Sequence, residues 1–290
     1  MTARANSIKK KIQSIDFAIS LLEKERRLLR KDLYVEKWEN NPFAHDKQMR
    51  KTAEFFYDLN YFIFDVNKAE PNSDNFEYNL AKKIWSCYPI GKPFVKELCE
   101  AKDPFVYRLE SEEKSTLIML CQAMSTQGWL EFTPFKTGVE IIPKLTGSNK
   151  CFLKGVWMES ANRYLINKTL HSFANEKKVK SCNVFWNVKL KEIGSEENAS
   201  CDMELDIVVE LDGRFYIFET KSGAIDFKKM TKMANLFDTE KSRFILCNSD
   251  ENQSSKLYSP THLLIPLPQL EKQLKDILTK DFPNESIMTA

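Results

Sequence analysis

The sequence predicts a mixed α/β protein, α+β overall, with a helical N-terminal region followed by a domain built around a β-sheet. Isoleucines and leucines at heptad spacing begin near the N-terminus, and amphipathic helical patterns follow. From residue 150 onward, helical and strand-like patterns follow one another in the order α-β-β-β-α-β. The chain has 290 residues, 42% hydrophobic and 29% charged, which is enough for two domains with buried cores.

Residues 5–38 are expected to form one long helix, which makes residues 1–40 a separate segment with a possible coiled coil. A heptad pattern of a little over three repeats runs through Ile8, Ile12, Ile15, Ile19, Leu22 and Leu29. Two interpretations stay open: a coiled-coil homodimer, or a helix packed on its own domain. The many Lys and Arg side chains of this helix indicate a solvated face, with a phosphate-contacting stripe as the alternative.

Residues 41–147 are expected to form a mainly helical domain. Residues 47–66 predict a helix that runs into a short apolar element, and residues 75–88 predict another helix. Pro89, Gly91 and Pro93 are expected to interrupt the chain before residues 94–101. The region lacks a Gly-rich loop and alternating strand–helix units, so no Rossmann-type domain is expected there.

Residues 110–146 within this domain predict a winged-helix-like element. A helix follows the candidate cap Ser111 and can end at Gly128, and two alternating runs then flank Lys136-Thr137-Gly138 as a hairpin. A DNA-reading wing and a structural connector are both compatible with this pattern.

The third predicted domain spans residues 150–280, after a boundary at Gly147-Ser148-Asn149. Its expected elements are a helix at 155–177, strands at 183–190 and within 202–223, a helix at 226–238, strands at 243–248 and 262–267, and a helix at 268–280. The centre of this domain is a hairpin, because Asp212-Gly213 separates two apolar runs rich in β-branched and aromatic residues.

The hairpin carries the candidate site. Asp206 lies early in its first strand, and Glu219 and Lys221 share a face at the end of the second. Two neighbouring carboxylates repel each other, and a hard divalent cation such as Mg²⁺ relieves that repulsion. A cation-bound water can then attack a phosphodiester, with Lys221 orienting or deprotonating it or stabilising the developing charge. Solvated charge is the usual explanation of Glu-x-Lys on an exposed strand, but these charges lie in largely apolar strands.

The residues Asp206 and Glu219-Thr220-Lys221 resemble the PD-(D/E)xK, or restriction-endonuclease-like, superfamily. The run at 152–160, which supplies Glu159, is similar to the nuclease domain of CRISPR ancillary nucleases that carry a CARF sensor; no CARF domain is recognisable here. The resemblance implies that Asp206, Glu219 and the Thr220 carbonyl bind Mg²⁺ or Mn²⁺. It also implies that Lys221 assists catalysis and that Glu159 completes the acidic set.

Neighbouring polar residues are weaker candidates. Glu204 shares a strand face with Asp206, as a further ligand or as part of the rim, and Asn187 and Lys189 could approach phosphate. Ser222, Lys228 and Lys229 could touch the substrate backbone. For each of them solvated surface is the preferred interpretation.

Seven Cys without a CxxC pair, and three His, provide no zinc-site signature. Reduced thiols, no signal-peptide pattern and no long apolar run predict a cytoplasmic protein without membrane association. The net charge of +2 excludes a strongly basic nucleic-acid binder but permits a local basic groove.

Together these features predict a metal-dependent endonuclease acting on DNA or, less favoured, RNA, by resemblance in antiviral defence. The protein is expected to be a homodimer, with an activating ligand or partner left unidentified. The alternative is a catalytically silent nucleic-acid-binding or assembly module that retains the nuclease fold.

Overall fold

The computed structural model describes residues 10–22, 24–25, 29, 41, 43–67, 75–109, 111–193, 201–221, 225–237, 239–248 and 263–283. Within these ranges the chain is a mixed α+β protein with two β-sheets. It divides into two compact units. The first comprises Met1–Val66 and Asn187–Leu205, and the second comprises Asn67–Trp186 and Asp206–Ala290.

The first unit contains α2 (Arg50–Asp58), β1 (Tyr61–Asn67) and the second half of β5 (Cys182–Glu192), which lies beside β1. Asn60 takes a left-handed conformation (φ 74°) and turns the chain from α2 into β1. Its carbonyl accepts a hydrogen bond from the Ile193 N–H at 2.9 Å, and Lys189 pairs with Asp65 at 2.9 Å. The apolar element expected in 47–66 is therefore a strand.

Residues 10–22 are helical, as the heptad pattern predicts, and every one of them is exposed. The seam side chains among them, which we call the heptad seam, are 49% to 65% exposed: Ile12, Ile15, Ile19 and Leu22. The rest of the helix predicted over residues 5–38 lies largely outside the described residues.

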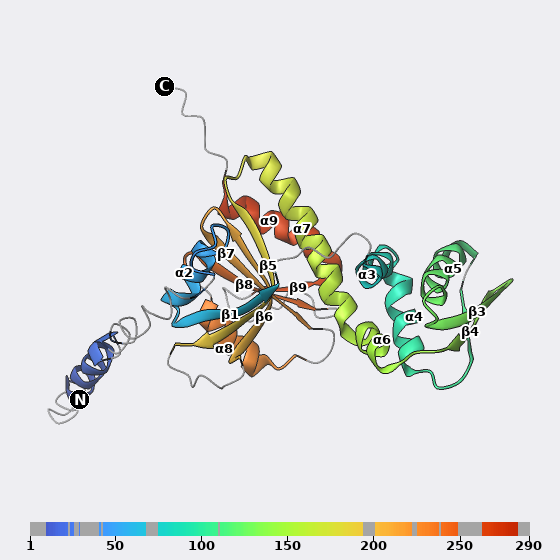
Figure 1. Ribbon diagram of the computed structural model, residues 1–290, viewed down its shortest axis with the longest axis horizontal. Coiled ribbons are helices and arrows are strands. Elements are labelled where there is room, and N and C mark those ends of the chain that lie inside the picture. The colour runs from blue at the N-terminus through green and yellow to red at the C-terminus, as the bar shows by residue number, and fades with distance from the viewer. Residues whose placement is uncertain are drawn as a thin grey trace, which may run out of the picture. The chain divides into compact units, whose positions relative to one another are not determined.

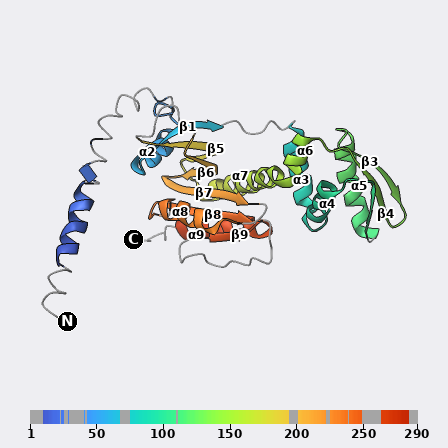
Figure 2. The same cartoon turned by 90° about the horizontal axis from the view of Figure 1, so that it is seen from below.

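The second unit begins with a helical region. It consists of α3 (Phe76–Ser86), α4 (Tyr88–Glu100), β2 (Phe105–Arg108), α5 (Ser111–Ser125), β3 (Leu130–Phe135) and β4 (Gly138–Pro143). Asn75 caps α3, because its side chain accepts the Tyr78 N–H at 3.0 Å. These elements gather at one end of α7 (Trp157–Lys177) in Figure 2.

The interruption expected at Pro89, Gly91 and Pro93 is wrong, because α4 runs through all three. Pro89 lies in the first helical turn, where its missing N–H needs no partner. Gly91 allows close packing: a Cβ there would lie 2.7 Å from the Ile84 carbonyl oxygen. Pro89 thus lies at the start of α4, and Gly91 lets α4 pack closely on α3. Composition alone does not distinguish these roles from those of Pro and Gly in a loop.

The winged-helix-like region holds a three-stranded antiparallel sheet in the order β2-β4-β3. The β3–β4 hairpin was predicted from its alternating pattern. β2 is not predicted from the sequence, because it has only four residues, which are alternately half-buried and exposed.

The remaining elements of the second unit are the strands of the larger sheet and the helices and turns around them. They are α6 (Gly147–Cys151), a π-helical turn (Phe152–Val156), α7, β5, β6 (Met203–Leu211), β7 (Arg214–Lys221), α8 (Phe227–Phe237), β8 (Ser242–Asn248), β9 (Leu263–Pro266), a 3-10 turn (Leu267–Gln269) and α9 (Leu270–Asp281). The strand order in this unit is β5-β6-β7-β8-β9. β6 and β7 are antiparallel, and β8 and β9 run parallel to their preceding neighbours.

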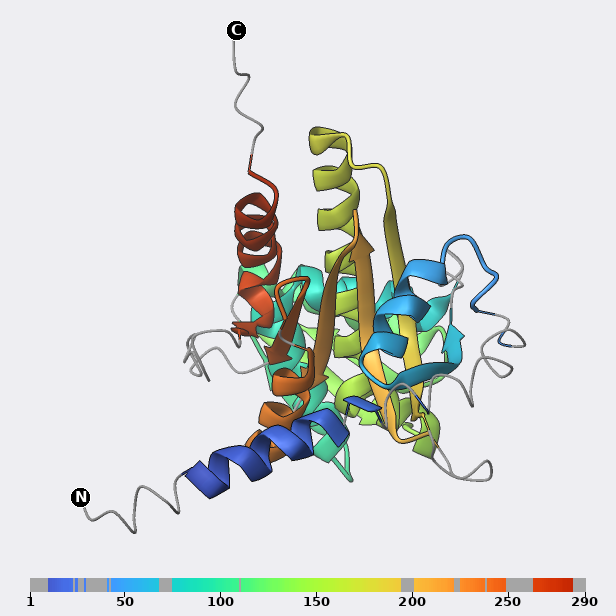
Figure 3. The same cartoon turned by 90° about the vertical axis from the view of Figure 1, so that its left-hand side faces the viewer.

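Helices cover this sheet. α7 extends along it in Figure 1 and packs against β7 and α9. The views agree that α7 and α9 lie side by side (Figure 3), while α8 packs against β8. The boundary predicted at residues 147–149 falls at the start of α6, inside the second unit.

The β6–β7 hairpin turns at Asp212 and Gly213, as their Asp-Gly pair predicts. Both have positive φ values, 45° and 82°, which suit a two-residue hairpin loop. Buried Glu210 supports the turn, since its carboxylate accepts hydrogen bonds from Ser181 Oγ, Asn183 Nδ2 and the Gly213 N–H at 2.7 to 2.9 Å. The hairpin is thus fixed at its closed end, and the candidate residues lie at its open end.

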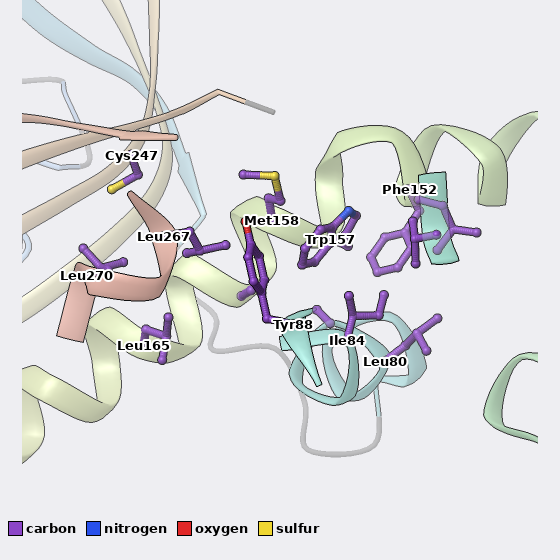
Figure 4. Close-up of a cluster of buried hydrophobic side chains, with 14 of the residues drawn as sticks. Leu80, Ile84, Tyr88, Phe152, Trp157, Met158, Leu165, Cys247, Leu267 and Leu270 are labelled. Atoms are coloured by element: carbon purple, nitrogen blue, oxygen red, sulfur yellow. The ribbon is translucent and has the colours of Figure 1, made fainter. Parts of the chain in front are cut away.

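One hydrophobic cluster runs through the second unit. Figure 4 shows part of it, where Ile84 and Tyr88 face Trp157 and Met158 of α7. The same cluster continues to Cys247 of β8 and to Leu267 and Leu270, which lie in the 3-10 turn and at the start of α9. Within this cluster α7 packs against α3, α9 and β7.

Candidate functional site

The register of the hairpin brings the two predicted carboxylates together. β6 and β7 pair Val208 with Ile217 and Ile207 with Phe218. Continuing this register by one residue places Asp206 opposite Glu219. The Thr220 N–H donates to Asp206 Oδ2 at 2.6 Å, so the carboxyl of Asp206 turns toward the end of β7.

Lys221 completes the group that the sequence predicted. Its Nζ donates to Glu219 Oε1 at 2.5 Å, as expected for residues two apart on one strand face. The Glu219 side chain is 5% exposed and that of Lys221 is 31% exposed. The carboxyl group of Glu219 is therefore buried beside a lysine side chain that solvent can still reach.

Burial raises the pKa of Asp206 to about 7, and the nearby charge of Glu219 adds to this effect. The Thr220 N–H and Lys221 act in the opposite direction, while Glu159 raises the pKa further. Burial lowers the pKa of Lys221, but the charges of Glu219, Asp206 and Glu159 outweigh it, so that the pKa is raised overall. The site thus concentrates negative charge and holds Lys221 as an ammonium.

The second carboxylate oxygen of Glu219, Oε2, is buried without a hydrogen-bond partner. An unpartnered buried carboxylate oxygen is costly, and a cation is the natural group to compensate for it. In the part of the chain described by the structure, no three His, Cys, Asp or Glu side chains gather as a metal site. A cation here would have to combine Asp206 and Glu219 with backbone oxygen and water, a set that suits Mg²⁺ or Mn²⁺.

Glu159 lies in the first turn of α7 and contributes through its charge to the pKa of Asp206 and Lys221. The structure thus joins Thr220 to Asp206 and Lys221 to Glu219 by hydrogen bonds, and the strand register sets these two pairs beside each other. Glu159 acts on Asp206 and Lys221 through its charge.

A further residue, Asn162, lies three residues after Glu159 on α7 and is not predicted from the sequence. Asn162 is fully buried, and its Nδ2 donates to Thr220 Oγ1 at 2.7 Å. Its position between Ala161 and Leu165, on the apolar side of the helix, was the available signal. A polar residue in such a stripe indicates a buried partner but does not say which one.

The weaker candidates show no comparable arrangement. Glu204 is exposed, Lys189 is paired with Asp65 in the first unit, and Lys228 and Lys229 are exposed on α8. Ser222 lies outside the described residues. Asn187 is exposed and has a left-handed backbone conformation, with φ 48°.

Comparisons with known proteins found similar solved structures of low sequence identity. No protein-family model matches the chain, and no curated protein matches it. One similar solved structure is protein VC1899 from Vibrio cholerae, with 16% identity and a TM-score of 0.43, covering 79% of this chain and 60% of that one. Another is Can2 from Sulfobacillus thermosulfidooxidans in complex with cyclic tetra-adenylate, with 12% identity and a TM-score of 0.46, covering 77% and 59%. The chain therefore spans about 60% of the length of these structures.

Among the described residues, no helix combines the length and the apolar composition that a membrane span requires.

Proposed function

We propose that this protein is a metal-dependent nuclease that hydrolyses phosphodiester bonds, with DNA favoured over RNA. The observation that carries the proposal is the cluster of Asp206, Glu219 and Lys221 at the open end of the hairpin, with Glu219 Oε2 buried and unpartnered. A role in antiviral defence rests on the sequence resemblance to CRISPR ancillary nucleases alone.

Asp206, Glu219 and the Thr220 carbonyl would hold the cation. The Thr220 N–H points toward Asp206, and within a strand the N–H and C=O of one residue point to the same side. The carbonyl is therefore directed to the same region as the carboxylates. A bound Mg²⁺ or Mn²⁺ supplies an activated water and stabilises charge on the phosphate.

Lys221 would then act as a donor. Its pKa is raised by the surrounding carboxylates, which favours the ammonium form and disfavours proton abstraction. Among the roles that the sequence left open, the charge therefore favours orienting the water and stabilising negative charge on the phosphate. Its partial exposure lets it meet a substrate while it stays bound to Glu219.

The test is cleavage of labelled single- and double-stranded DNA and RNA, with Mg²⁺ or Mn²⁺ and then with excess chelator. Wild type should cleave at least one substrate only with the cation, and Glu219→Gln should lose activity by at least about a hundredfold. Glu176→Gln is the matched control, since Glu176 is an exposed residue further along α7 that pairs with Lys275. Full activity in chelator, or in Glu219→Gln, contradicts the proposal.

Binding without cleavage under every metal condition would support the alternative, a silent module that keeps the fold. Gel-shift or anisotropy measurements on the same substrates distinguish this outcome from a protein that neither binds nor cleaves.

We further propose that the heptad seam makes the protein a homodimer. All four seam residues named above are about half-exposed or more, and an apolar stripe of this kind on a helix is stabilised by pairing with an equivalent stripe. A seam of this length is marginal by itself, so other contacts between the copies would be needed.

A further inference from the structure

Asn162 is a buried polar residue whose position is not explained by packing alone. It is 0% exposed, on the side of α7 that faces the sheet. Its Nδ2 donates to Thr220 Oγ1 at 2.7 Å, while its Oδ1 is buried without a partner. A half-satisfied buried amide is costly, and an apolar side chain of similar size would avoid that cost. The amide therefore has a use that offsets this cost.

Its partner, Thr220, is the residue between the two that carry the charges of the site. The Thr220 side chain points to the α7 face of the sheet, whereas Glu219 and Lys221 point to the other face. Its N–H donates to Asp206 Oδ2 at 2.6 Å. Thr220 thus joins Asn162 of α7, through its side chain, to Asp206 of β6, through its backbone N–H.

The same bond links α7 to the site. Asn162 lies three residues after Glu159, about one helical turn, so both side chains lie on neighbouring positions of one face. The bond from Asn162 to β7 therefore also sets the position of Glu159 relative to β7. This position determines how strongly the charge of Glu159 acts on Asp206.

We propose that Asn162 is a positioning residue. By holding the Thr220 hydroxyl, it fixes the peptide whose N–H orients Asp206 and whose carbonyl points toward the cation site. This inference rests on the proposed function, because it assumes that the site binds a divalent cation. Residues that orient metal ligands in this way typically change metal affinity by tenfold or more when they are replaced.

The test is the affinity for Mn²⁺, measured by electron paramagnetic resonance on the full-length protein well below its melting temperature. Asn162→Leu and Thr220→Val should each weaken Mn²⁺ binding by about tenfold. The double variant should be little weaker than either single variant, because both changes remove one hydrogen bond. Thr220→Ser keeps the hydroxyl and should recover most of the affinity.

Thr169→Val is the matched control. Thr169 is also buried, and its Oγ1 donates to the Leu165 carbonyl at 2.8 Å, two turns further along α7. This variant should lower thermal stability about as much as Thr220→Val while leaving Mn²⁺ binding unchanged.

The outcomes separate this inference from the function on which it rests. Wild-type affinity in folded Asn162→Leu and Thr220→Val, or equal weakening in Thr169→Val, would show that Asn162 serves packing only. If Asn162→Leu does not fold, the comparison of Thr220→Val with Thr220→Ser decides the question. Absence of Mn²⁺ binding in wild type would instead overturn the proposed function.

Discussion

At Asp206, burial and the charge of Glu219 act together, and the consequence is a pH dependence of stability. The pKa rises from 3.8 to about 7 in the folded protein, so the native state binds a proton more tightly than the unfolded chain. This contribution to stability is fully present below pH 3.8 and is lost as the pH rises to about 7.

The prediction for the metal-free protein is a melting temperature that falls between about pH 4 and about pH 7, the interval between the unfolded and folded pKa values of Asp206. Asp206→Asn should flatten that fall, and Mn²⁺ should stabilise wild type more at the higher pH, where Asp206 is ionised. Differential scanning fluorimetry in chelator and in Mn²⁺ measures both effects. An identical fall in wild type and Asp206→Asn would show that another group is responsible.

Lys221 should affect the chemical step more than substrate binding. Lys221→Met keeps the apolar stem and removes the charge, so the single-turnover cleavage rate should fall by at least about a hundredfold. Equilibrium binding at fixed salt should change far less, because one phosphate contact among several contributes modestly. Lys272→Met, an exposed change on α9, is the control. Equal losses in substrate binding and in cleavage rate would show that Lys221 binds phosphate and does not act in the chemical step.

At this scale the sequence predicts part of the site. Asp206, Glu219 and Lys221 follow from the alternation of strand residues and the Asp-Gly turn, because both fix which side chains share a face. Asn162 could not be predicted as the partner of Thr220. Its bond joins residues 58 positions apart, and only the packing of α7 on β7 brings them together.

Among the elements, α4 shows most clearly how context overrides local preference. Gly91 is needed where α3 and α4 meet, because a Cβ would lie 2.7 Å from the Ile84 carbonyl. Gly91→Ala should therefore destabilise the fold by about 1–3 kcal/mol, the usual cost of overpacking. Gly147→Ala is the control, since a Cβ there meets nothing within 4 Å. Thermal unfolding that is equally affected, or unaffected, in both variants would contradict this account of α4.

The heptad seam gives the prediction about assembly. Replacing Ile15 and Ile19 by lysine should convert a dimer to a monomer, because two charges would enter the apolar interface. Gln13→Lys with Ser20→Lys adds the same charge outside the seam and should leave the dimer intact. Light scattering at tens of micromolar measures both, and a wild-type protein that is already monomeric would disprove the assignment.

For the whole molecule, the sequence predicts the order of the elements after residue 150 better than the architecture before it. Helices and strands there have long, regular patterns and a strong turn, so α7, the β6–β7 hairpin, α8 and β8 fall near their expected positions. Before residue 150, short strands such as β2 and helix-internal glycine and proline leave weak signals. Their structures depend on neighbours that are distant in sequence.

The central claim is that Asp206, Glu219 and Thr220 hold a divalent cation, and a crystal soaked in Mn²⁺ tests it most directly. We predict an anomalous scattering peak about 2 Å from Glu219 Oε2 and from the Thr220 carbonyl oxygen. In Glu219→Gln crystals soaked in the same way, the peak should be absent or strongly reduced. No peak at this position in wild type, or an equal peak in Glu219→Gln, would contradict the claim.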